Sequence, residues 1–119
     1  MDGYNFGDYH DKWHKWQTFD EVFDNTLNEL SHRWPDKPIM ITEFACAPGD
    51  PQVRERWIRD AFASLARRPQ VKAVIWFNYD KRSEREPNWR VDATPGALAA
   101  FNETFAAPSP PPANGTAAR

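Results

Sequence analysis

Glu43 is the strongest candidate for a chemically active residue in this 119-residue chain. It follows residues 38–42, an apolar and partly β-branched run that favours a strand covered on both faces. A carboxylate is costly to bury where such a run breaks off, and α/β barrels keep their catalytic residues at the C-terminal ends of strands. The position therefore indicates a nucleophile, general base or metal ligand. The alternative is a strand-end glutamate that pairs with an arginine or lysine.

Two further groups lie where strands are expected to end. Trp76 stands near the end of the apolar run 71–78, where an indole can offer a flat face to a sugar ring. The alternative is a core tryptophan. Tyr4 and Asn5 would also lie at a strand end if a strand precedes Asp2, and a tyrosine hydroxyl can orient a carboxylate. For these two residues a turn rich in Gly and Asn is the alternative.

Other reactive residue types give weaker signals. His10 and His14 have the i, i+4 spacing of helical metal ligands, but no third ligand is implied, so we expect neither a metal nor a cofactor. Cys46 has no cysteine partner and is expected to be a small buried residue. The charged segment 81–93 is most simply a solvated loop.

Composition narrows the classes of partner. The net charge of −2 gives no basic excess for nucleic acid, and no apolar stretch is long enough to cross a membrane. The N-terminal segment has neither the basic nor the apolar region of a signal peptide. Aromatic residues make up 14 % of the chain, which fits either a heavy core or a cleft that stacks on sugars.

The elements that must position these residues alternate between helix and strand. Residues 1–17 are predicted to be a loop. A capping box at Thr18 and Glu21 starts the first helix, Asp50 and Pro51 start the second, and Thr94 starts the third. The two apolar runs between these helices are the predicted strands.

This alternation predicts an α/β architecture of parallel strands with crossover helices. Two strands cannot make a sheet buried on both faces, so the chain is expected to be part of a larger sheet or barrel. We expect one partial domain over residues 1–106. The Pro-rich residues 107–119 are expected to be a disordered linker or tail, with a possible further module beyond.

Four motifs together resemble a known family. They are residues 2–5 (DGYN), 38–44 (PIMITEF), 73–78 (AVIWFN) and 89–92 (WRVD). In this order they resemble the C-terminal part of glycoside hydrolase family 26, over residues 2 to about 106. The resemblance implies a C-terminal fragment of a (β/α)₈ TIM barrel, running from the loop after strand 6 to helix 8. Enzymes of that family carry two catalytic glutamates, and most are β-mannanases.

The resemblance also implies roles for single residues. Glu43 matches the nucleophile, Tyr4 the tyrosine that hydrogen-bonds it, and Trp76 the aromatic platform, with Asn5 as a candidate substrate-binding residue. The family's acid/base glutamate has no counterpart here, and a retaining glycosidase needs both carboxyl groups.

The expected function is therefore retaining hydrolysis of β-1,4-mannan-type or related β-glycans, with the nucleophile in this chain and the acid/base absent. The expected partner is a polysaccharide, and the complete enzyme is expected to be extracellular. The first alternative is a non-catalytic carbohydrate-binding or inactive fragment. The second is a chain that does not fold alone.

Overall fold

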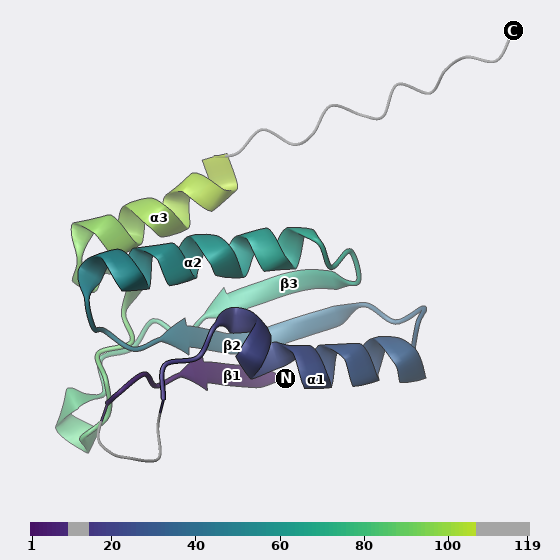
Figure 1. The fold of residues 1–119 in the computed structure, drawn as a ribbon, viewed down its shortest axis with the longest axis horizontal. Helices are drawn as coiled ribbons and strands as arrows, with labels where there is room; N and C mark the ends of the chain where they lie inside the picture. Colours follow the sequence, from purple (N-terminus) through teal and green to yellow (C-terminus); the bar gives the residue numbers. More distant parts are fainter. Residues whose placement is uncertain (10–14, 107–119) are drawn as a thin grey trace, which may run out of the picture.

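Three parallel strands form the centre of the computed structural model, which describes residues 1–9 and 15–106 (Figure 1). They are β1 (Asp2–Asn5), β2 (Ile39–Cys46) and β3 (Val71–Trp76), and they lie in the order β1-β2-β3. Both neighbouring pairs are parallel, and Asp2 of β1 lies opposite Glu43 of β2. The predicted α/β class with parallel strands is confirmed.

Two strand predictions are corrected. Residues 2–5 were expected in a loop, but they form β1, because hydrogen bonding to β2 stabilises a segment whose own composition favours a turn. Glu43 was expected at the end of its strand, but β2 continues to Cys46. The continuation is physically reasonable, since the residues from Phe44 to Cys46 are fully buried and apolar.

All three predicted helices form, and each begins directly after its predicted capping residue. Before α1 (Phe19–Arg33), the Thr18 hydroxyl accepts from the Glu21 amide at 3.1 Å and the Glu21 carboxylate accepts from the Thr18 amide at 2.7 Å. Asp50 caps α2 (Pro51–Ala66) by accepting from two amides, and Thr94 caps α3 (Pro95–Ala106). Local capping chemistry therefore defines the helix starts.

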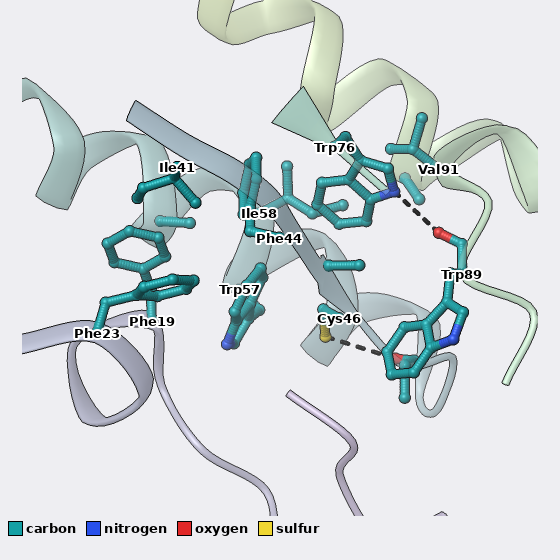
Figure 2. Close-up of a cluster of buried hydrophobic side chains, with 14 of the residues drawn as sticks. Phe19, Phe23, Ile41, Phe44, Cys46, Trp57, Ile58, Trp76, Trp89 and Val91 are labelled. Atoms are coloured by element: carbon teal, nitrogen blue, oxygen red, sulfur yellow. Dashed lines mark hydrogen bonds between the residues drawn. The ribbon is translucent and has the colours of Figure 1, made fainter. Parts of the chain in front are cut away.

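The core lies between one face of the sheet and the helices. Phe44 of β2 packs against Trp57 of α2 and Phe19 of α1, with ring centroids 6.4 and 6.2 Å apart (Figure 2). Polar contacts join the helices at their surfaces: Arg68 pairs with Asp24, and Arg59 of α2 pairs with Glu103 of α3 at 2.9 Å. Helices α1 and α2 thus cover the same face of the sheet.

The opposite sheet face is bare among the described residues. Met40 of β2 is 43 % exposed and Ile75 of β3 is 49 % exposed, whereas Ile39 and Ile41, which flank Met40 on β2, are buried. The observed sheet has three strands and not the two expected. It still leaves one apolar face uncovered within residues 1–9 and 15–106.

Some expectations fall outside the described residues. His10 and His14 lie in the segment 10–14, and the predicted linker is segment 107–119, neither of which the structure describes.

Within the described ranges, no helix combines the length and the apolar character that a membrane span requires.

Candidate functional site

Tyr4 and Glu43 contact each other across two neighbouring strands. The Tyr4 hydroxyl donates a hydrogen bond to Oε2 of Glu43. Tyr4 lies opposite Ala45, two residues beyond Glu43, so the period of two places both side chains on one face. Burial, then the hydrogen bond to Glu43 and the charge of that carboxylate raise the pKa of Tyr4 above its ordinary value near 10. The phenol therefore stays protonated and remains a donor at neutral pH.

This pair opens into a cavity of about 300 Å³ near the C-terminal ends of the strands. Four aromatic side chains and three charged ones line it: Tyr4, Phe6, Phe77, Trp89, Glu43, Lys81 and Glu86. Aromatic walls with a few convergent polar groups are typical of small-molecule and sugar sites. A larger hollow of about 450 Å³ over α1 and α2 contains none of these residues.

Trp89 forms the inner wall of the cavity. Its ring centroid lies 5.3 Å from that of Tyr4 and 4.9 Å from that of Phe6, and only 1 % of the residue is exposed. The carbonyl oxygen of Trp89 accepts from the Trp76 indole at 2.8 Å (Figure 2). The sequence motif contained Trp89, but nothing in its charged surroundings indicated that it would pack against Tyr4.

Trp76 does not line this cavity. It is 8 % exposed, and its ring packs against Phe44 at 5.1 Å and Phe101 at 5.8 Å on the helix side of the sheet. A buried indole cannot present its face to a sugar, so this position contradicts the predicted platform and agrees with the core alternative. The next residue, Phe77, reaches the other side and lines the cavity.

Asn5 has a structural position and is not open to a substrate. It is fully buried, and its Oδ1 accepts from the amides of Gly7 at 3.0 Å and Gln17 at 3.1 Å. Gly7 has φ = +59°, the left-handed region that glycine adopts readily. Asn5 therefore fixes the chain after β1, and its position contradicts the predicted substrate contact.

The charged loop after β3 reaches the cavity, contrary to the expectation of a fully solvated loop. Lys81 Nζ lies 2.7 Å from Oε1 of Glu86 and 3.3 Å from Oε2 of Glu84. The hydrogen bond from Lys81 lowers the pKa of Glu86, so this carboxylate is an acceptor and not a proton donor at neutral pH. Figure 1 shows the loop beyond the arrowheads of β1 and β2.

Arg54 and Cys46 are two further buried side chains whose chemistry bears on the site. Arg54 of α2 donates from Nη2 to the carbonyl oxygens of Trp89 at 3.4 Å and Arg90 at 3.1 Å, which holds the chain around the Trp89 wall. Burial raises the pKa of the Cys46 thiol to about 12, so it is a neutral thiol and a poor nucleophile. This agrees with the expectation of a small buried residue.

In the described part of the chain, no group of three or more His, Cys, Asp and Glu side chains could hold a metal ion. The arrangement instead offers one carboxylate, oriented by a phenol, in an aromatic cavity. Such a carboxylate can act as a nucleophile on a bound sugar or stabilise positive charge that develops there.

The chain is similar to known glycosyl hydrolases. Residues 9–105 match the family model described as glycosyl hydrolase catalytic core. Over 113 residues the chain is 37 % identical to a protein named endoglucanase H from Acetivibrio thermocellus. The aligned segment covers 94 % of this chain but only 12 % of that relative.

Proposed function

The chain belongs to the glycosyl hydrolase catalytic core family, and from this premise we propose that Glu43 is the nucleophile of a retaining β-glycanase. The observation that carries the proposal is the contact of the Tyr4 hydroxyl with the Glu43 carboxylate at an aromatic cavity. The finer proposal is membership of glycoside hydrolase family 26, with the three strands described here forming part of a (β/α)₈ barrel. The parallel order β1-β2-β3 and the bare sheet face support that fold.

In the proposed reaction, Glu43 attacks the anomeric carbon as the glycosidic bond breaks. A covalent glycosyl ester forms, and the leaving oxygen takes a proton from a general acid. Water, deprotonated by the same acid/base group, then attacks the anomeric carbon and releases Glu43. Because Tyr4 binds Oε2, it leaves Oε1 as the attacking oxygen and holds the carboxylate plane in place.

We propose that the general acid comes from a part of the complete enzyme outside residues 1–119. The reason is the contact of Glu86, the second glutamate at the cavity, with Lys81 Nζ at 2.7 Å: it lowers the pKa of Glu86, whereas a general acid needs a raised one. A retaining mechanism requires a second carboxyl group about 5–5.5 Å from the nucleophile.

The proposed substrates are β-1,4-linked glucan and mannan. The relative is named an endoglucanase, which supports a glucan backbone, whereas the resemblance to family 26 supports mannan. Both are extracellular polymers, so we propose that the complete enzyme acts outside the cell. Finding it in the culture medium of its source would test that location.

A direct test is the substitution Glu43→Ala in the complete enzyme. Release of reducing ends from β-glucan and β-mannan should fall to background. Azide should then restore cleavage of an activated aryl β-glycoside and give an α-glycosyl azide, because the small anion enters from the side that Glu43 occupied. The matched control is Glu29→Ala, which removes a surface glutamate of α1 paired with Arg33. Full activity in the Glu43 variant would contradict the assignment.

The second candidate function is carbohydrate binding without hydrolysis. The lining of the cavity favours it, since four aromatic side chains and the Lys81–Glu86 ion pair can bind a sugar whether or not a proton donor is present. Saturable binding of oligosaccharides together with no release of reducing ends would support this function against the first.

A further inference from the structure

We propose that Lys81 and Glu86 form a hydroxyl-binding clamp beside Glu43, which selects a neutral hexose unit over a charged one. This inference deepens the proposed function and rests on it. Both side chains line the same cavity of about 300 Å³ as Glu43 and Tyr4. Neither residue was assigned a role from the sequence.

The clamp has a defined geometry. Lys81 Nζ donates to Oε1 of Glu86 at 2.7 Å, and both side chains are only partly exposed. Arg85, between the two glutamates, has φ = +61°, a left-handed conformation that non-glycine residues rarely adopt. This turn brings Glu84 and Glu86 to the same ammonium group, but only Glu86 also lines the cavity.

Several contacts fix Glu86 in the cavity wall. Its carboxylate accepts from Lys81 Nζ at 2.7 Å, and its carbonyl oxygen accepts from the Tyr9 hydroxyl at 3.0 Å. Trp89 in turn packs against Tyr4, which binds Glu43. The clamp and the proposed nucleophile are therefore two polar groups of one connected wall.

The chemistry of the clamp matches a sugar. A carboxylate accepts from one hydroxyl, an ammonium group donates to another, and adjacent hydroxyls of a pyranose ring can satisfy both at once. A neutral ring does this without breaking the ion pair. Aromatic walls at Phe6 and Phe77 can cover the apolar face of the same ring.

The charge of the lining excludes anionic sugars. Glu43 and Glu86 are two carboxylates, and Lys81 is the single cation among the seven described residues that line the cavity. A uronic acid would bring a third carboxylate into this space, where like charges repel. The cavity therefore favours neutral glucose or mannose units.

The experiment titrates the protein, as its gene encodes it, with cellotetraose, mannotetraose and a tetrasaccharide of uronic acids, by calorimetry. Three variants are compared with the natural protein: Glu86→Gln, Lys81→Met and the control Glu84→Gln. We expect the neutral tetrasaccharides to bind more tightly than the anionic one. Glu86→Gln and Lys81→Met should each weaken neutral binding roughly 10-fold, since each removes a charged hydrogen-bonding group.

Two signatures separate a clamp from a loop that merely unfolds. In Glu86→Gln, the difference in affinity between the neutral and the anionic tetrasaccharides should be smaller than in the natural protein, because one repelling charge is gone. The affinity of Glu84→Gln for neutral sugars should stay within about 2-fold of the natural value. Glu84 forms only an exposed ion pair with Lys81, and such pairs contribute little energy. Near-UV circular dichroism, which reports the packing of the six tryptophans together, should be unchanged in all three variants.

The outcomes also separate this inference from the proposed function. If Glu86→Gln and Lys81→Met hydrolyse the polymer and bind neutral sugars with natural affinity, the clamp proposal is wrong and the glycosidase proposal is supported. Binding that both substitutions weaken, without any hydrolysis, would support the clamp and contradict the glycosidase. Preference for the anionic sugar, an equal loss in Glu84→Gln, or no binding at millimolar sugar would overturn the clamp.

Discussion

At the scale of single residues, Tyr4 is the partner that defines Glu43. A phenol that donates to one carboxylate oxygen fixes the orientation of that carboxylate, as a nucleophile requires. Burial keeps the phenol protonated, so the donor is present throughout the range of neutral pH. Tyr4 thus holds the Glu43 carboxylate in one orientation.

The raised pKa of Tyr4 predicts a loss of stability at alkaline pH. Its folded pKa lies above the ordinary value near 10, so the neutral phenol contributes its full stabilisation below pH 10. That contribution is lost as pH rises from 10 through the folded pKa. The free energy of unfolding, measured in urea, should fall more steeply above pH 10 in the natural chain than in Tyr4→Phe. Parallel pH profiles would contradict the contact.

Asn5 provides a prediction that separates structure from substrate binding. Asn5→Ala leaves the buried amide of Gly7 and the partly buried amide of Gln17 without their acceptor. The free energy of unfolding should fall by about 2 kcal/mol. In the complete protein, the affinity for oligosaccharides should change little at temperatures where the variant is folded. A large loss of affinity at unchanged stability would restore the substrate role first expected for Asn5.

At the scale of elements, the sequence predicted the helices better than the strands. Capping residues act within one turn, so Thr18 and Asp50 fixed their helix starts whatever lies around them. Strand β1 depends on hydrogen bonding to β2, a partner about forty residues away, and its Gly and Asn favour a turn in isolation. Local pattern could therefore not predict it.

The site was only partly predictable for the same reason. Glu43 and Tyr4 were identified from motifs, and the structure brings them into contact. Trp76 and Phe77 are adjacent aromatics, and only the side of the sheet that each faces decides which one is buried. The contacts of Lys81, Glu86 and Trp89 with the cavity arise from loop geometry, for which the sequence carries no periodic signal.

The capping box of α1 gives a prediction at this scale. Thr18→Ala removes the acceptor of the Glu21 amide and should lower the free energy of unfolding by about 1 kcal/mol. Thr26→Ala, at an exposed position in the middle of the same helix, is the control and should be neutral or slightly stabilising. Chemical denaturation measures both. Equal effects of the two substitutions would show that the cap contributes nothing.

At the scale of the whole molecule, the helices cover one sheet face in the described part of the chain, and the other face is exposed away from the cavity. Met40 and Ile75 lie exposed on strands β2 and β3. An exposed apolar sheet face marks an interaction site or an aggregation hazard. The proposed barrel explains the bare face, because further strands would turn it toward the interior.

The bare face predicts self-association of the 119-residue chain. Sedimentation velocity should show oligomers that increase with protein concentration. The double substitution Met40→Thr and Ile75→Thr should reduce them and keep residues that suit a strand. Val53→Thr, at an exposed apolar position of α2, is the control and should leave the oligomers unchanged. A natural chain that stays monomeric at high concentration would contradict this prediction.

The central claim, that Glu43 is the nucleophile, is tested most directly by trapping the glycosyl-enzyme. A 2-deoxy-2-fluoro β-glycoside with a dinitrophenolate leaving group needs no general acid, because that group departs without protonation, so the reaction reports on Glu43 itself. Mass spectrometry should find one sugar per chain, attached to the peptide that contains Glu43, and Tyr4→Phe should label more slowly. No adduct, or an adduct on another carboxylate such as Glu86, would contradict the claim.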